Sequence, residues 1–300
     1  MFWGGNYVAG HLLVGYIDPY LLSILRWGFT SLLMFSLYWR VIRKDWHLLT
    51  ENLAINSLFS LLGQVSFPLT LYIGLQYTSS LNAAIYISAT PCLVLIINFL
   101  FFKEHISKRN VIGAVVSTIG VIYLALSDVN GESQFASFGV GDVLTIISAL
   151  SWAFYCALLR KKDKRITHTS FVSFCSLIGT VMLIPIYLAF LFFSRDSLTL
   201  SMPEDASIYP ALGVAYLVIF PSWLSYVFWN KGVAMIGTTR SEIFTHIIPV
   251  SGGLLSIVLL DEQIHLYHVI ALVMIIFGIV CCSGKNKEKS SITATPSKSV

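Results

Sequence analysis

Long stretches without a charged side chain constrain this chain more than any other feature. No Asp, Glu, Lys or Arg occurs between Asn52 and Phe102. Other charge-free stretches include residues 111–127, 166–194, 206–230, 243–260 and 263–284. A bilayer core about 30 Å thick is crossed by roughly 20 apolar residues in a helix. Because backbone polar groups must pair internally in lipid, each stretch is expected to be helical.

The overall composition leads to the same class of protein. The chain is 56% apolar and only 11% charged, whereas a soluble domain carries roughly 25% charged residues. A lipid-facing surface does not need more charge than this. The five cysteines are scattered and indicate neither a disulfide framework nor a metal cluster. The net charge of +4 comes from loop residues and does not indicate nucleic-acid binding.

These stretches predict an all-α membrane protein with ten transmembrane helices. The longest stretch fits two spans, which are separated between Gln76 and Asn82. The expected spans are residues 1–15, 19–41, 53–76, 82–102, 111–127, 142–159, 170–193, 209–230, 241–260 and 266–283. The first span is short for a bilayer, and residues 2–15 lack the basic segment that begins a cleavable signal peptide.

The basic residues alternate regularly between the two sides of these spans. The tail and the loops after spans 2, 4, 6 and 8 hold 17 of the 19 Lys and Arg residues, whereas the opposite loops hold only Arg195. Short cytoplasmic loops are enriched in Lys and Arg. We therefore expect a multi-pass protein of the cytoplasmic (inner) membrane with both termini in the cytoplasm. The remaining basic residue, Arg26, lies inside the second span.

An internal duplication is indicated by residues that recur 158 positions apart. The pairs at this spacing include Gly74–Gly232, Pro91–Pro249, Glu104–Glu262 and Gly120–Gly278. The expected repeats cover residues 1–127 and 138–284, and residues 285–300 are expected to form a disordered cytoplasmic tail. Because five spans is an odd number, the two five-helix repeats are expected to be inverted. Inverted repeats typically place a binding site between the halves, where alternating access operates.

The same features resemble a known family. Phe2-Trp3-Gly4-Gly5-Asn6 in the first span, a proline in spans 4 and 9 followed 13 residues later by glutamate, and the duplicated five-span unit resemble the EamA type of the drug/metabolite transporter superfamily. The resemblance covers roughly residues 1–284. It implies ten spans, cytoplasmic termini, and export or exchange of small metabolites such as amino acids.

Several candidate substrate-binding residues share a pattern of an aromatic ring beside a hydrogen-bonding group. Helical spacing places the members of each set on one face of a helix. The sets are Trp3, Asn6 and Tyr7 in span 1, Trp152 and Tyr155 in span 6, and Trp223 and Tyr226 in span 8. Such faces suit an amphipathic organic solute. The alternative for the aromatic residues is packing or interfacial anchoring, which we favour for Trp229 near its span end.

Polar residues within the spans supply the remaining candidates, which are Arg26, Gln64, Tyr86, Glu242 and His246. A charge at the depth of Arg26 is costly, so it either binds an anionic substrate group or reaches the outer interface. Gln64 lines the cavity or makes an interhelical hydrogen bond. Glu242 either couples transport to protons, together with His246, or only begins a helix.

The favoured function is a secondary transporter of one small metabolite. No Walker-type phosphate loop occurs in the sequence, so ATP hydrolysis is not expected. The alternatives are a nucleotide-linked or adenosyl metabolite carried by the same fold, an intramembrane enzyme, and a scaffold without transport. We expect no catalytic residues, metal or cofactor and no nucleic-acid partner. The expected partners are a small-molecule substrate, the lipid bilayer and, as an open alternative to a monomer, a second copy in a homodimer.

Overall fold

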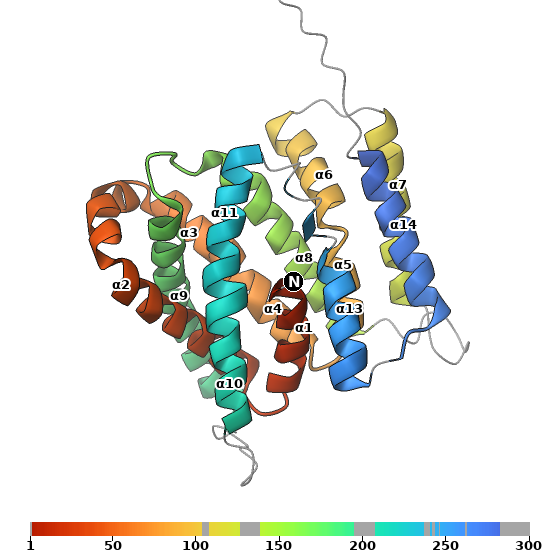
Figure 1. Ribbon diagram of the computed structural model, residues 1–300, viewed down its shortest axis with the longest axis horizontal. Coiled ribbons are helices and arrows are strands. Elements are labelled where there is room, and N and C mark those ends of the chain that lie inside the picture. The colour runs from red at the N-terminus through yellow and green to blue at the C-terminus, as the bar shows by residue number, and fades with distance from the viewer. Residues whose placement is uncertain are drawn as a thin grey trace, which may run out of the picture.

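The regular structure of the described chain is helical (Figure 1). The computed structural model describes residues 2–103, 108–126, 139–194, 208–236, 241, 244–245, 247–261 and 263–282. The first part contains α1 (Phe2–Leu13), α2 (Pro19–Glu51), α3 (Leu53–Ser60), η1 (Leu61–Ser66), α4 (Phe67–Gly74), α5 (Ser80–Ile87), α6 (Thr90–Phe102) and α7 (Lys108–Leu126). The second part contains α8 (Val140–Leu158), η2 (Leu159–Lys161), α9 (His168–Ser194), α10 (Ile208–Leu217), η3 (Val218–Leu224), α11 (Ser225–Ile236), α13 (Ile247–Leu260) and α14 (Leu266–Cys282).

Six helical stretches of the described chain are long and apolar enough to cross a membrane. They are Pro19–Glu51, Leu53–Gly74, Ser80–Phe102, Val140–Lys161, His168–Phe193 and Ile208–Met235. Shorter apolar helices cover Val111–Gly120, Ile247–Leu260 and Leu266–Gly278, and α1 has 12 residues. The all-helical, multi-pass class is therefore confirmed, while the full count of ten inverted spans stays a prediction.

The start of α2 shows how the local sequence sets the end of a helix. The Asp18 carboxylate caps α2 by accepting hydrogen bonds from the backbone N–H groups of Tyr20 at 2.8 Å and Leu21 at 3.3 Å. Pro19 then occupies the first turn, where its missing N–H costs nothing. α2 continues to Glu51, beyond the expected end of span 2 at residue 41.

The exterior of the described helices is apolar, whereas the exterior of a soluble protein carries many polar and charged side chains. Large exposed side chains follow one face of α7 and of α14, and these two helices pack against each other at one edge of the bundle (Figure 1). The polar residues Asn6, Arg26 and Gln64 are instead almost fully buried. A surface of this kind is stable in lipid, which has no water to solvate polar groups.

α1 lies in the middle of the bundle and packs closely on α13. A Cβ atom on Gly4 would approach the backbone nitrogen of Gly252 to 2.6 Å. Only a hydrogen atom fits between the two helices there, as in other small-residue contacts between transmembrane helices. This close crossing fixes the position of α1, which carries Trp3 and Asn6.

Two π-helical segments interrupt the helices on either side of α1. η1 lies between α3 and α4, directly before Pro68, and η3 lies between α10 and α11 and contains Pro221. Proline removes a backbone donor and disturbs the ladder of the preceding turn, and π-helical turns are common at functional sites. Both segments contribute backbone carbonyl groups to the region described next.

Candidate functional site

Arg26 of α2 is a fully buried cation at the centre of a polar network. Its Nε atom donates a hydrogen bond to the Ser222 hydroxyl of η3 at 2.6 Å. Its Nη1 atom donates to Asn6 Oδ1 at 2.9 Å and to the Tyr72 hydroxyl at 2.6 Å. Tyr72 in turn donates to Asn6 Oδ1 at 3.1 Å. The network therefore joins α1, α2, α4 and η3 around one guanidinium group.

The charge of Arg26 has no opposite charge beside it among the described residues. Neither the His47–Glu51 ion pair nor the Asp163–Arg165 ion pair includes Arg26. The Nη2 atom of Arg26 is buried without a hydrogen-bond partner. A buried charge without compensation is costly, and a guanidinium group is well shaped to bind a carboxylate or phosphate. The arrangement can therefore receive an anionic group.

A cluster of six aromatic residues lies beside this network. The aromatic cluster consists of Trp3, Trp27, Trp152, Tyr155, Tyr226 and Trp229. The rings of Trp152 and Tyr155 are stacked with centroids 5.0 Å apart. Trp27 joins the cluster to the cation, since Arg26 Cζ lies 5.0 Å from its ring centroid and Tyr226 lies 5.1 Å away on the other side.

Each π-helical segment accepts a hydrogen bond from a member of the aromatic cluster. The Tyr226 hydroxyl donates to the Gly63 carbonyl of η1 at 2.6 Å. Trp3 Nε1 donates to the Pro221 carbonyl of η3 at 3.0 Å. A Cβ atom on Gly63 would lie 2.7 Å from Tyr155 Cδ2, so glycine is needed for this close approach. The π-helical backbone therefore helps to position the rings of Tyr155, Tyr226 and Trp3. Its carbonyl groups also accept the hydrogen bonds that Tyr226 and Trp3 donate.

A cavity of about 500 Å³ between α1, α11 and α13 reaches one side of the aromatic cluster. Trp3 and Trp229 form part of its wall, together with Phe2, Phe228 and Ile248. Its lining follows α11 from Ser225 to Met235 and includes Ile247 and Ile248 at the start of α13. Its size is within the usual range for sites that bind small organic molecules.

The structure brings together most of the residues that the sequence patterns single out. Trp3, Trp152, Tyr155 and Tyr226 belong to the aromatic cluster, and Asn6 and Arg26 belong to the polar network. Tyr7 is buried in the same core, with 2% of its surface exposed. Arg26 is fully buried in protein and does not extend to the membrane surface, and its binding of an anionic substrate group stays a prediction.

Three other candidates lie apart from this region. Gln64 is fully buried and its side chain packs against Gly179 of α9. The Tyr86 hydroxyl donates to Asp142 Oδ1 at 3.0 Å near the start of α8, within a separate hydrophobic cluster. Trp223 is half-buried and its ring lies 6.2 Å from that of Tyr38.

The two candidate coupling residues, Glu242 and His246, lie outside the described residues. Thr245, which precedes His246, is described and almost fully buried. Proton coupling through this segment stays a prediction.

Tyr72, Ser222, Trp27 and Trp229 were not predicted as site residues. The assignment of Trp229 as an interfacial anchor is wrong, because it is only 8% exposed and its ring lies 5.2 Å from that of Trp3. For Tyr72, a signal was present in the sequence. It lies 158 positions before Asn230, and Asn230 shares a helical face with Tyr226.

The loop after η2 contains the clearest titratable pair outside the spans. The Arg165 side chain donates to the Asp163 carboxylate at 2.7 Å, and the Arg165 backbone N–H donates to it at 2.9 Å. These hydrogen bonds hold the pKa of Asp163 at about 2, below its ordinary value near 3.8. The pair therefore stays ionised throughout the physiological pH range.

Similarity to known proteins covers nearly the whole chain. The profile of the EamA-like transporter family matches residues 1–126 and 139–284. "Uncharacterized transporter YyaM" of Bacillus subtilis (strain 168) is 27% identical over 97% of this chain and 95% of its own. "Uncharacterized transporter YetK" of the same organism is 28% identical over 99% of this chain and 88% of its own. An "Uncharacterized transporter" of Archaeoglobus fulgidus is 24% identical over 96% of each chain.

A solved crystal structure has the same fold. It matches with a TM-score of 0.64 at 18% sequence identity, over 93% of this chain and 92% of its own. The family profile, the membrane-spanning helices and the relatives agree with one another and confirm the resemblance carried by the sequence motifs. The chain belongs to the EamA-like transporter family.

Proposed function

We propose that the protein is a secondary transporter that binds one small organic anion or zwitterion beside Arg26. The observation that carries this proposal is the buried guanidinium group, whose Nη2 atom has no partner among the described residues. Ionisable residues inside membrane spans are costly and mark substrate pathways. The transporter names of the relatives support the same class of function.

The surroundings of Arg26 favour a solute with a single negative group and an amphipathic body. A carboxylate would pair with the guanidinium group, and the flat surfaces of Trp3, Trp152 and Tyr226 would contact the rest of the molecule. An amino acid fits this description. A nucleotide-linked solute is less well supported, because Arg26 is the one cation within the described polar network.

Alternating access by two inverted repeats is supported by backbone features that recur at the spacing of the sequence repeat. The two described non-glycine residues with positive φ are Lys103 and Asp261, both at 53° and 158 positions apart. When η1 is shifted by 158 positions along the chain, it overlaps with η3. Their carbonyl acceptors, Gly63 and Pro221, are also 158 positions apart.

Hydrogen-bonded amide–phenol pairs recur in the same way. In the first half, the Tyr72 hydroxyl donates to Asn6 at 3.1 Å, and in the second half Asn230 donates to the Tyr155 hydroxyl at 3.0 Å. Tyr72 and Asn230 are 158 positions apart. Asn6 and Tyr155 are 149 apart, the same spacing as Trp3 and Trp152. Each half therefore contains an amide hydrogen-bonded to a phenol at equivalent positions. The two residue types are exchanged, because Asn230 corresponds to Tyr72 and Tyr155 corresponds to Asn6.

The finer assignments belong to this proposal. The ten apolar helical segments would form two inverted five-helix repeats, with both termini on the cytoplasmic side of the cytoplasmic membrane. Export or exchange of the solute would follow from exposing the site to each side in turn. Gln64, Tyr86 and Trp223 stay proposed contacts, reached in conformations other than the one described, and Glu242 and His246 also stay proposed contacts.

The test is exchange in proteoliposomes loaded with a pool of common metabolites and analysed by mass spectrometry. The wild-type protein is expected to release a carboxylate-bearing solute from the liposomes when the same solute is supplied outside. Arg26→Gln should lose this exchange, while Arg43→Gln, which removes an exposed charge from the end of the same helix, should keep it. No exchange by the wild-type protein, or equal exchange by Arg26→Gln, would contradict the proposal.

A further inference from the structure

A second cavity, of about 450 Å³, lies at the same end of the bundle as the end of α11 and has a strongly basic wall. Arg160, Lys162, Lys164 and His168 line it, and we call it the basic vestibule. Three of these side chains carry a permanent positive charge. The cavity is therefore distinct from the aromatic cavity between α1, α11 and α13, where none of the described lining residues is charged.

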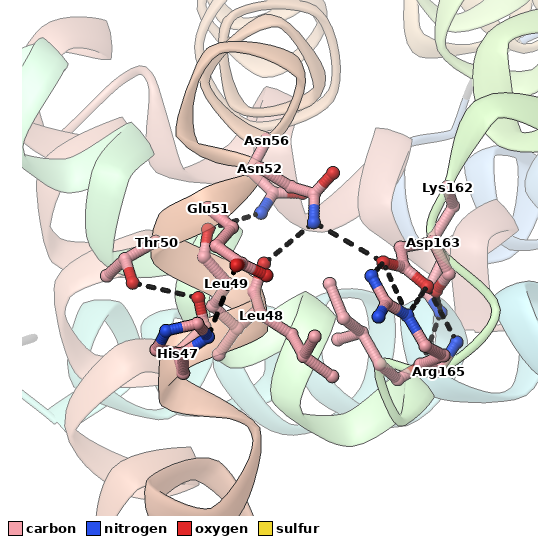
Figure 2. Close-up of polar contacts among 11 residues, drawn as sticks. His47, Leu48, Leu49, Thr50, Glu51, Asn52, Asn56, Lys162, Asp163 and Arg165 are labelled. Atoms are coloured by element: carbon pink, nitrogen blue, oxygen red, sulfur yellow. Dashed lines mark hydrogen bonds and ion pairs between the residues drawn. The ribbon is translucent and has the colours of Figure 1, made fainter.

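Asp163 of the adjoining loop is not among the described residues that line the vestibule, although it and Asp45 attract the Lys162 ammonium group and so offset part of its charge. Figure 2 shows the Asp163 carboxylate directed toward Asn52 and Arg165, with Asn52 Nδ2 at 3.4 Å. Among the described residues, the lining contains no Asp or Glu. Lys162 donates to the backbone carbonyls of Ile166 at 2.6 Å and Asp163 at 3.2 Å, and neither acceptor cancels its charge. The vestibule thus presents a positive field to its interior.

The inner wall of the vestibule reaches a buried amide group that contacts the aromatic cluster. Asn230 lines the vestibule, and only 3% of its surface is exposed. Its Nδ2 atom donates to the Tyr155 hydroxyl at 3.0 Å, while its Oδ1 atom is buried without a partner among the described residues. The buried Nδ1 atom of His168 also lacks a partner there. Unpartnered buried polar atoms around a cavity are typical of a ligand-binding site.

We propose that the basic vestibule is a separate binding site for a free carboxylate-bearing solute, from which the solute passes beside Asn230 to the aromatic cluster. The basic side chains attract the carboxylate from solution, and Asn230 Oδ1 accepts a hydrogen bond from a donor on the solute. The route between the two sites rests on the proposed transport function. The anion binding itself does not, because it follows from the vestibule's own residues.

Benzoate is a suitable probe, with benzamide as its uncharged counterpart of the same shape. Binding is measured by saturation-transfer NMR with purified protein in nanodiscs of zwitterionic lipid, using the Arg26→Gln background to remove the central site. We expect benzoate to bind this background and benzamide not to bind. Lys162→Gln and Lys164→Gln should each weaken benzoate binding roughly fivefold, the effect of one unit charge at about 4 Å in nearly aqueous surroundings.

The matched control is Lys161→Gln. Lys161 belongs to the same loop and carries the same charge, but its ammonium group lies 5.9 Å from the Phe102 ring and outside the vestibule lining. Equal weakening by Lys161→Gln, or no benzoate binding in the Arg26→Gln background, would overturn the proposal. Displacement of benzoate when anionic phosphatidylglycerol replaces the zwitterionic lipid would assign the vestibule to lipid headgroups and also overturn it. Unchanged melting temperatures confirm that each variant is folded.

These outcomes separate the vestibule from the transport function. If the wild-type protein exchanges no solute but benzoate binding still depends on Lys162 and Lys164, the proposed function fails and the vestibule stands. If exchange depends on Arg26 but benzoate does not bind the Arg26→Gln background, the vestibule fails and the proposed function stands.

Discussion

The Asn230 amide of α11 donates a hydrogen bond of 3.0 Å to the Tyr155 hydroxyl of α8. The contact lies between the basic vestibule and the aromatic cluster, since Asn230 lines the former and Tyr155 belongs to the latter. It is the second-half counterpart of the bond between Tyr72 and Asn6. On the proposed route, a solute that moves from the basic vestibule to the aromatic cluster passes this bond.

The Asn230–Tyr155 bond should be measurable as a coupling energy. Asn230→Ala and Tyr155→Phe, alone and combined, should give a coupling of about 0.5–2 kcal/mol in the free energy of unfolding, as for other side-chain bonds within membrane bundles. The control replaces Asn98, whose buried amide has no partner among the described residues. Asn98→Ala should be additive with Tyr155→Phe, and an equal coupling in both cycles would contradict the assignment.

Gly63 should not tolerate a side chain. Gly63→Ala places a methyl group 2.7 Å from Tyr155 Cδ2, and overpacking of this kind costs about 1–3 kcal/mol. Gly232→Ala is the matched change, because nothing lies within 4 Å of its Cβ position, and it should raise stability by up to about 1 kcal/mol through helix propensity. Thermal unfolding of the two variants tests this, and equal melting temperatures would be contrary to the described packing.

The Asp163–Arg165 pair predicts an acid-dependent contribution to loop stability. Because folding lowers the pKa of Asp163 from 3.8 to about 2, the pair stabilises the folded state fully above pH 4 and loses this effect as the pH falls toward 2. The difference in melting temperature between wild type and Asp163→Asn should therefore be constant from pH 5 to 8 and shrink below pH 4. If this difference in melting temperature grows below pH 4, folding raises the pKa of Asp163 instead of lowering it.

The proposed topology predicts which loops react from outside the cell. In a background with the native cysteines replaced, a cysteine at Asp261 should react with an impermeant thiol reagent, whereas one at Lys162 should not. The reason is that Lys162 belongs to the basic loops, which are retained in the cytoplasm. Labelling of intact cells and of inverted vesicles provides the comparison, and reaction at Lys162 in intact cells would reverse the orientation.

The helical class and the central aromatic residues could be predicted because they depend on local patterns. The charge-free stretches identify the spans, and the recurrence of Trp3 and Trp152 on equivalent helices identifies two sides of the aromatic cluster. Arg26 was recognisable because a cation within a span needs a protein environment. The repeat spacing also anticipates the matching positions of Lys103 and Asp261, where both helices end in a left-handed residue.

The polar network itself could not be predicted, because it depends on which helices meet. Ser222 becomes a partner of Arg26 only through the packing of η3 on α2. Gln64 has the right chemistry for the cavity, but the π-helical turns of η1 direct Gly63 toward Tyr155 and Gln64 toward Gly179. Helical spacing assumes 3.6 residues per turn, so a π-helical turn shifts every face that follows it.

The proposed function depends most on the charge of Arg26. The most direct test compares the binding of a carboxylate with that of its uncharged analogue. The solute identified by proteoliposome exchange and its carboxamide are titrated by calorimetry into the wild-type protein and Arg26→Gln. A charge-assisted hydrogen bond contributes about 1.5–3 kcal/mol, so the wild-type protein should bind the carboxylate at least about tenfold more tightly. Arg26→Gln should bind both forms equally. The same preference for the carboxylate in both proteins would contradict the role of Arg26.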